Sequence, residues 1–139
     1  MFTYSDQDEI GTSEAEIDVA GRRFTIYDVH PDGSDTAMRV WAETLLERSG
    51  DNPYVIALGD YNLRDYEEAY QLIAAGYTNA WVSVYPSKVG ADGTDMSGDN
   101  RIDHIFVSPS LFVRNPMYIL PPASATDHPV HWAEIYWEK

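Results

Sequence analysis

Acidic, amide and imidazole side chains are concentrated at four places in this chain, each at the end of a segment with strand character. Asp60 and Asn62 directly follow the apolar run 54–58, and in an extended backbone residues two apart project the same way. Carboxylates and amides bind hard divalent cations and orient water, and imidazole transfers protons near neutral pH. The full set is His30, Asp60, Asn62, Asp103, Asp127 and His128.

Taken singly, each of these groups has an ordinary explanation. A His before Pro, as at His30, is usually a loop residue, and an Asp after Gly, as at Asp60, usually forms a turn or caps a helix. Asp103 can form an ion pair with Arg101, and Asp-His-Pro at 127–129 can form a turn. Four such groups at strand ends in one small domain favour a shared functional site.

A hairpin, two helices and several further strands must position these side chains. The segment 15–20 alternates apolar and acidic residues, and 23–29 is rich in Phe, Thr, Ile and Tyr, which predicts a hairpin. Asp65 with Glu68 three residues later resembles the capping box of a helix. The predicted strands are 15–20, 23–29, 54–58, 101–107, 111–120 and 129–137, and the predicted helices are 34–48 and 65–75.

The remaining segments complete an α/β arrangement with a mixed sheet. The segment 77–85 suits a short strand, and the loop 86–100 is long for a compact domain, which predicts that it lies near the site or moves. Residues 1–13 are polar and acidic and are expected to form a flexible lead-in. Residues 14–139 are then expected to form a single domain.

The composition restricts the chemistry. The chain has 139 residues, 23 acidic against 9 basic side chains, a net charge of −14 and no Cys, which excludes disulfides and thiolate chemistry. Such an acidic surface argues against non-specific DNA binding, but a bound cation can still create a phosphate site. Neither a signal-peptide pattern nor a membrane-spanning run is present, and the sequence leaves the localisation open between membrane-anchored and cytoplasmic.

Three short motifs follow one another along the chain. They are Gly-Asp-Tyr-Asn at 59–62, Arg-Ile-Asp-His-Ile-Phe at 101–106 and Thr-Asp-His-Pro-Val at 126–130. In this order they resemble the endonuclease/exonuclease/phosphatase family of metal-dependent phosphoesterases, which includes DNase I. The family signatures are Gly-Asp-Phe-Asn, Arg-Ile-Asp-Tyr-Ile-Phe and Ser-Asp-His-x-Pro-Val. The resemblance spans about 15–136 and corresponds to the C-terminal half of such a domain. It implies half of a DNase I-like sandwich, with a mixed, mostly antiparallel sheet and helices on one face.

The resemblance also implies a role for each group in hydrolysis of a phosphodiester or phosphomonoester by an activated water. Asp60 would orient or deprotonate the water, and Asn62 would hold the water or a phosphoryl oxygen. His128 would contact the scissile phosphate, with Asp103 fixing its tautomer. His30 would stabilise charge on the phosphate or the leaving group. Whether Asp60 or His128 is the base stays open.

A divalent cation belongs to this implied chemistry. The expected ion is Mg²⁺ or Mn²⁺, because Mg²⁺ prefers one or two carboxylates together with water. Asp127, Asp60 and Asn62 are the expected ligands. The family's N-terminal half also carries an early Asn and a metal-binding Glu, and nothing before residue 15 resembles either.

Two interpretations are therefore open. The chain is part of a magnesium-dependent catalytic domain, or it is a catalytically incomplete half-domain that serves only in folding and association. A lone half exposes the sheet face that normally packs on its counterpart, so the expected protein partner is that missing half or a second copy packed sheet on sheet. At His104, where the family has Tyr, the simplest interpretation is a ring that packs in the place of the Tyr. A membrane-anchored bacterial branch of the family also carries Ile-Asp-His there.

Other functions fit less well. Asp92, Asp95 and Asp99 can serve a calcium-binding module, but their loop lacks the spacing of an EF-hand. The absence of Gly-x-Ser-x-Gly disfavours a serine hydrolase. The expected substrate is a phosphate ester in a small molecule, a lipid head group or a nucleic acid, and the acidic charge favours the first two.

Overall fold

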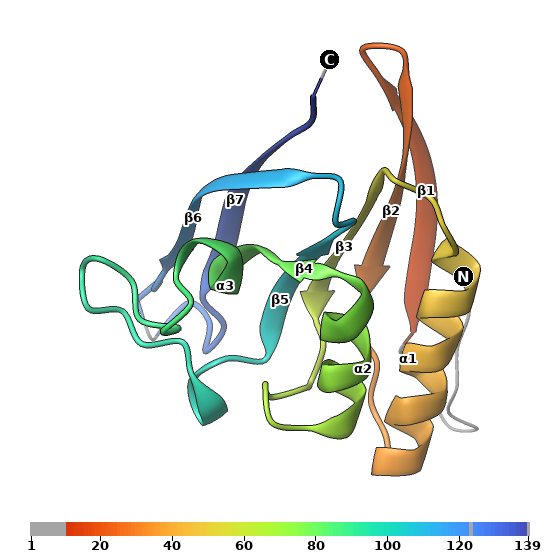
Figure 1. The fold of residues 1–139 in the computed structure, drawn as a ribbon. Coiled ribbons are helices and arrows are strands. Elements are labelled where there is room, and N and C mark those ends of the chain that lie inside the picture. The colour runs from red at the N-terminus through yellow and green to blue at the C-terminus, as the bar shows by residue number, and fades with distance from the viewer. Residues whose placement is uncertain (1–10, 123, 139) are drawn as a thin grey trace.

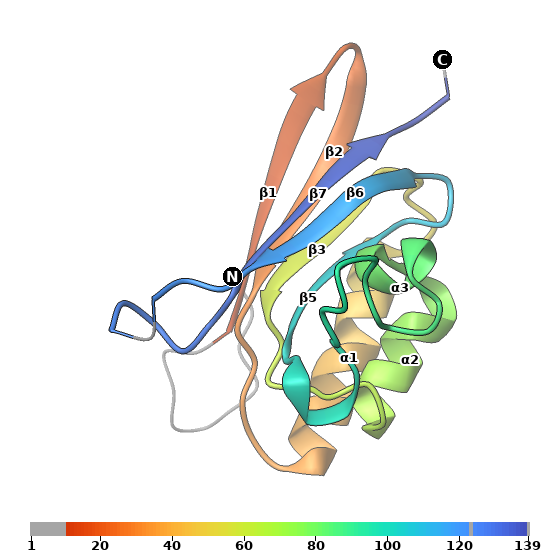
Figure 2. The ribbon, with the colours of Figure 1, turned by 90° about the vertical axis from the view of Figure 1, so that its left-hand side faces the viewer.

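The computed structural model describes residues 11–122 and 124–138. A five-stranded sheet in the order β1-β2-β3-β5-β4 forms the centre, and a separate two-stranded sheet pairs β6 with β7. The helices α1 and α2 lie side by side over one face of the large sheet, and β6 and β7 lie away from them (Figures 1 and 2). The elements are β1 Thr12–Val19, β2 Arg22–Val29, α1 Asp35–Ser49, β3 Val55–Asp60, α2 Glu68–Gly76, β4 Thr78–Asn79, α3 Ala80–Val84, the 3-10 turn Gly98–Asn100, β5 Asp103–Val107, β6 Phe112–Ile119 and β7 Val130–Tyr136.

The large sheet is mixed, as predicted. β2 and β3 run parallel and are connected through α1, whereas β1–β2, β3–β5 and β4–β5 are antiparallel. The parallel pair brings the ends of β2 and β3 to the same edge of the sheet. The residues that follow these two strands, His30 and Tyr61, therefore begin loops that lie close together.

Alternation along the strands divides the apolar residues between two cores. On β2, Tyr27 and Val29 are buried beneath the helices together with Trp41 of α1, and Phe24 and Ile26 point to the opposite face. There they meet the inner side of β6–β7, including Ile135. The hairpin β6–β7 therefore already covers part of the sheet face that the sequence analysis expects a partner to cover.

The first strand begins earlier than predicted. Thr12 and Ser13, expected to belong to a flexible lead-in, are the first residues of β1. Thr12 is fully buried, and its Oγ1 accepts a hydrogen bond of 2.8 Å from Nε1 of Trp41, which fixes the strand to α1. The rest of the expected lead-in, residues 1–10, lies outside the described residues.

The predicted capping box does not form. α2 begins at Glu68 with Glu67 at its N-cap and without a capping side-chain hydrogen bond. The Asp65 carboxylate instead pairs with Lys88 at 2.6 Å and accepts from the backbone N–H of Gly98. In the segment 77–85, the expected strand is only the two residues of β4, and the short helix α3 follows it directly.

Gly59 places β3 against β2 immediately before Asp60. Its φ is +137°, in a region that favours glycine, and a Cβ at this position would lie 2.2 Å from the carbonyl oxygen of Val29. The obstacle is backbone from the paired strand, so neither strand can move aside without breaking the ladder. The glycine in the Gly-Asp motif is therefore required by the contact between the two strands that carry His30 and Asp60.

We predict that Gly59→Ala lowers the free energy of unfolding by about 4 kcal/mol or more, because both the clash and the backbone strain act together. Gly21→Ala is the matched control. Gly21 also has a positive φ, +78°, but a Cβ added there meets nothing within 4 Å. The substitution Gly21→Ala should therefore lower the free energy of unfolding by only about 1–2 kcal/mol. Urea unfolding of both variants measures the difference, and equal losses would contradict the role assigned to Gly59.

Candidate active site

Asp60 and Asp103 lie opposite each other on the paired strands β3 and β5. The backbone N–H of Tyr61 donates to the carbonyl of Ile102 at 2.9 Å, which makes Asp60 and Asp103 a non-hydrogen-bonded pair of the antiparallel ladder. In such a pair the side chains stand closest together and point to the same face. The ladder therefore brings two carboxylates side by side, on the face away from α1 and α2.

The Asp60 carboxylate is fixed on one side and available on the other. Its Oδ1 accepts a hydrogen bond of 2.8 Å from the backbone N–H of Asn62. Its Oδ2 lies 3.7 Å from Nε2 of His30 and 3.8 Å from Nε2 of His128. Neither distance is that of a hydrogen bond, so two imidazole nitrogens face this oxygen without engaging it.

His128 is oriented by Asp103. Its Nδ1 lies 3.1 and 3.0 Å from the two carboxylate oxygens of Asp103, and a carboxylate only accepts, so Nδ1 carries a proton. The hydrogen bond and the charge of Asp103 raise the pKa of His128. Burial raises the pKa of Asp103, and the contact with His128 offsets part of this effect. The ring thus presents Nε2 towards Asp60, as an acceptor when neutral and a donor when protonated.

Asn62 connects the two loops at this edge of the sheet. Its backbone has a φ of +49°, and its Nδ2 donates to the carbonyl of Pro31 at 2.9 Å. With Nδ2 turned to this carbonyl, Oδ1 is the side-chain atom that can bind a cation, and the second N–H of Nδ2 remains as a donor. His30 precedes Pro31, so the same contact ties the His30 loop to the Asp60 loop.

Comparison with known proteins identifies the family. The model of the Endonuclease/Exonuclease/phosphatase family matches residues 4–128. The chain belongs to this family. No curated protein sequence matches the chain closely enough to count as a relative.

Solved structures support the DNase I-like fold of the family. A conserved protein of unknown function from Enterococcus faecalis is 19% identical with a TM-score of 0.70, covering 96% of this chain and 60% of its own. An endonuclease/exonuclease/phosphatase from Bacteroides vulgatus is 19% identical with a TM-score of 0.64, and the match covers 86% of this chain and 51% of that protein. The human Nocturnin catalytic domain is 21% identical with a TM-score of 0.63, and the match covers 90% of this chain and 52% of that domain. The chain thus spans between half and three fifths of the length of these structures.

His104, which replaces the Tyr of the family motif, has a structural role. Its side chain is buried against the rings of Tyr61, Tyr70 and Phe106, as the packing interpretation predicts. Burial lowers its pKa to about 3, so the ring is neutral. Nε2 lies 2.7 Å from the carbonyl of Leu63, which only accepts, so Nε2 carries the proton. His104 therefore holds the backbone directly after Asn62.

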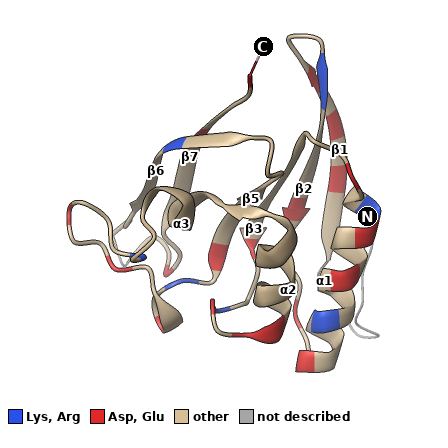
Figure 3. Cartoon of the chain, in the orientation of Figure 1, with Lys and Arg blue, Asp and Glu red and all other residues tan. Residues whose placement is uncertain are grey.

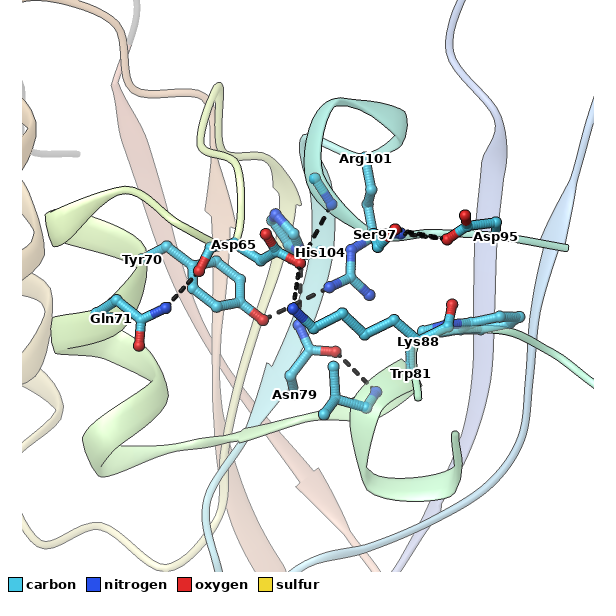
Figure 4. Close-up of polar contacts among 12 residues, drawn as sticks. Asp65, Tyr70, Gln71, Asn79, Trp81, Lys88, Asp95, Ser97, Arg101 and His104 are labelled. Atoms are coloured by element: carbon cyan, nitrogen blue, oxygen red, sulfur yellow. Dashed lines mark hydrogen bonds and ion pairs between the residues drawn. The ribbon is translucent and has the colours of Figure 1, made fainter. Parts of the chain in front are cut away.

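The long loop 86–100 is anchored to the rest of the domain. Figure 4 shows the side chain of Lys88 reaching the carboxylate of Asp65, which lies in the segment before α2. Nε1 of Trp81 donates to the carbonyl of Lys88 at 2.9 Å, which secures the beginning of the same loop. Beside this ion pair lies the guanidinium of Arg101, which is buried and reaches Tyr70 at 3.5 Å.

The acidic residues of this loop do not gather around a common point. Asp92 accepts from the backbone N–H of Thr94, and Asp95 accepts from the N–H and hydroxyl of Ser97, so each closes a local turn. Asp99 forms an ion pair with Arg64 at 2.8 Å. Figure 3 shows acidic residues spread over α1, α2, β1 and the loops, with few basic ones between them.

One cluster in the described part of the chain suits a metal ion. Ligand atoms of Asp60, Asp103 and His128 lie within 4.8 Å of one another. Two carboxylates and the free amide oxygen of Asn62 are the oxygen ligands that a hard divalent cation prefers, so the residues fit the expected ion. The carboxylate of Asp127 lies 4.0 Å from His128 and is 97% exposed, so the structure places this expected ligand at the rim of the cluster.

The structure brings five of the six residues singled out from the sequence close together and places Asp127 at their rim, but sequence reasoning missed the groups that hold their backbone. These contacts involve main-chain carbonyls: Tyr118 donates to one, and the carbonyls of Leu63 and Pro31 accept from site or neighbouring side chains. No pattern of side chains in the sequence predicts such contacts.

Among the described residues, no helix is both long and apolar enough to cross a membrane.

We predict that the chain loses stability as the pH falls from about 7 to 5. Burial, with the charge of Arg101, lowers the pKa of both His104 and His131 to about 3, whereas the unfolded chain takes up these protons near 6.5. The contribution of each neutral His to the free energy of unfolding is fully present above about pH 6.5 and declines as the pH falls towards 3. At pH 5 each His has lost about 2 kcal/mol of this contribution. His128, with its raised pKa, acts in the opposite direction and is common to all variants compared.

His131→Phe isolates this effect. Neither ring nitrogen of His131 has a hydrogen-bond partner among the described residues, and the ring stacks on Tyr118 at 4.0 Å, so Phe can replace it. Urea unfolding at pH 7 and pH 5 should show that the variant loses about 2 kcal/mol less than the parent. An equal loss in both proteins would mean that His131 is not a buried neutral ring.

Proposed function

We propose that this chain carries the catalytic groups of an Mg²⁺- or Mn²⁺-dependent phosphoesterase that hydrolyses a phosphate ester with an activated water. The observation that carries the proposal is the arrangement around Oδ2 of Asp60. Two imidazoles from separate segments of the chain face this carboxylate oxygen, and the amide of Asn62 follows two residues after it in the third segment. Such a combination offers water activation, proton transfer and recognition of an oxyanion together.

The residues divide this work according to their contacts. Asp60, held by the N–H of Asn62, orients a water or accepts its proton through Oδ2. His128, with Nδ1 bound to Asp103, uses Nε2 as a base when neutral or as a donor to a phosphoryl or leaving oxygen when protonated. His30 faces the same oxygen of Asp60 from the other side and stabilises negative charge. Asp60, Asp103 and Asn62 are the groups that would hold the cation.

The bound cation would neutralise charge on the phosphoryl group and lower the pKa of a bound water. The Nocturnin catalytic domain, which shares the fold, was solved with a bound sulfate, a tetrahedral oxyanion like phosphate. The net charge of −14 disfavours long polyanions, so we propose a small or membrane-presented phosphate ester as the substrate.

The test is hydrolysis of bis-p-nitrophenyl phosphate by this chain with Mg²⁺ or Mn²⁺ and with EDTA. Asp60→Asn keeps the shape of the side chain and removes its charge, so it should reduce turnover at least about 100-fold. Asp92→Asn is the matched control, because Asp92 closes a distant turn, and it should change turnover less than about 2-fold. Turnover that EDTA leaves unchanged, or that Asp60→Asn retains, would contradict the proposal.

A second role, association with a further sheet, is favoured by the outer face of β6–β7. Cross-strand pairs on this face are apolar, with Met117 opposite Trp132 and Ile119 opposite Val130. These four side chains are between 41% and 54% exposed. A two-stranded sheet is marginal by itself, and neither outer edge of this sheet has a strand partner among the described residues. A bare apolar face next to free edges is a typical docking surface.

We propose that the chain on its own extends this small sheet with a second copy at the free edge of β7, whereas a longer protein would cover the face with the part that the chain's structural neighbours have and it lacks. Antiparallel addition of β7 to the β7 of a second copy, centred on Ala133, places Trp132 opposite Glu134 of that copy. No like charges then meet along the new edge.

Sedimentation at micromolar concentration should therefore show a dimer. Trp132→Glu places two carboxylates opposite each other and should yield a monomer. Val40→Glu, at an exposed position of α1, is the matched control and should leave the dimer unchanged. A parent chain that sediments as a monomer would exclude the second copy as the occupant.

A further inference from the structure

The outer edge of β5 is unprotected where it carries Asp103. β4 pairs with β5 only at Phe106 and Val107, at the other end of the strand. Because Asp103 and Asp60 form a non-hydrogen-bonded pair, the N–H and C=O of Asp103 point away from β3. The backbone that carries the orienting carboxylate thus lacks a strand on its outer side in the described part of the chain.

A tyrosine hydroxyl takes the place of that strand. Oη of Tyr118, on β6, donates to the main-chain carbonyl of Asp103 at 2.8 Å. The contact joins the small sheet to the large one at the position of the site. It also supplies this half-buried carbonyl with a partner that strand pairing does not provide.

The surroundings of Tyr118 restrict its ring to one position. The ring stacks on His131, with centroids 4.0 Å apart and planes at 18°, and forms a T-shaped pair with Trp81, with centroids 5.1 Å apart. Burial raises the pKa of Tyr118 well above its usual range, so the hydroxyl stays protonated and remains a donor. A rigid ring with a fixed donor can hold the backbone of Asp103 in register.

We propose that Tyr118 is a positioning residue of the site, which fixes the backbone of Asp103 and thereby the carboxylate that orients His128. Without this hydroxyl, the first residue of β5 would be held on one side only, and its carboxylate would no longer keep both oxygens at Nδ1 of His128. His128 would then lose its preference for the proton on Nδ1. The proposal rests on the proposed function only for its effect on turnover.

The first readout is the tautomer of His128, from long-range ¹H–¹⁵N correlation spectra of the metal-free chain at an alkaline pH where the ring is neutral. The parent should hold the proton on Nδ1. In Tyr118→Phe, which keeps the ring and its stacking, the ratio of the Nδ1–H to the Nε2–H form should fall at least about 3-fold. A thermal melt establishes that the variant is folded.

The control is Tyr136→Phe, the same change on the outer face of the same hairpin, where the ring stacks on Phe112. It should leave the tautomer ratio of His128 unchanged. A folded Tyr118→Phe with the ratio of the parent would overturn the proposal. Should Tyr118→Phe not fold, His131→Ala decides instead, because it removes the stacked ring and keeps the hydroxyl: a partial shift supports the proposal, and an unchanged ratio overturns it.

The second readout is turnover of bis-p-nitrophenyl phosphate. Tyr118→Phe should lower kcat about 10-fold and leave KM unchanged, because the hydroxyl orients a catalytic pair and touches no substrate. A fall confined to KM would overturn the positioning role. If the parent chain shows no turnover, the proposed function fails, and the tautomer ratio alone still decides the role of Tyr118.

Discussion

Two carboxylates held opposite each other by one antiparallel strand pair are the constraint on which the site depends. The ladder places Asp60 and Asp103 side by side, so their repulsion has to be balanced within the fold. His128 balances part of it through its contact with Asp103, and its raised pKa is the consequence. A divalent cation would balance more, and this need is the physical reason why the site suits a metal-dependent reaction.

Most of the surrounding contacts act on the backbone that carries these groups rather than on the groups themselves. Gly59 allows β3 to approach β2, and His104 holds the carbonyl of Leu63. The functional side chains make few contacts by comparison, and Nε2 of His128 and Oδ2 of Asp60 remain open to a ligand. A site with a firmly held backbone and open functional atoms costs little reorganisation when a substrate arrives.

Much of the fold and of the site is predictable from local patterns. Alternation identified the hairpin of β1 and β2, and the short apolar run identified β3, because each pattern reports on which face of a strand is buried. The failures arise where distant contacts override a local signal. Asp65 has the spacing of a cap, but Lys88 and Gly98 reach it from a loop more than twenty residues away.

Prediction of the site from sequence is limited for the same reason, because distant contacts leave no local signal. The residue types that carry charge or transfer protons stand out in the sequence, whereas Tyr118 resembles any other Tyr in an amphipathic strand. Its importance comes from a carbonyl that strand pairing leaves free, and this is visible only once β4 is seen to end before Asp103. The apolar outer face of β6–β7 likewise appears only when the sheet that covers its inner face is known.

The central claim is that Asp60, Asp103 and their neighbours form a divalent-cation site, and locating Mn²⁺ in crystals of this chain by anomalous scattering tests it most directly. The account predicts a peak at the carboxylate of Asp60 that disappears in crystals of Asp60→Asn. A peak confined to the loop of Asp92 and Asp95, or none at Asp60 when the crystals are saturated with Mn²⁺, would contradict it.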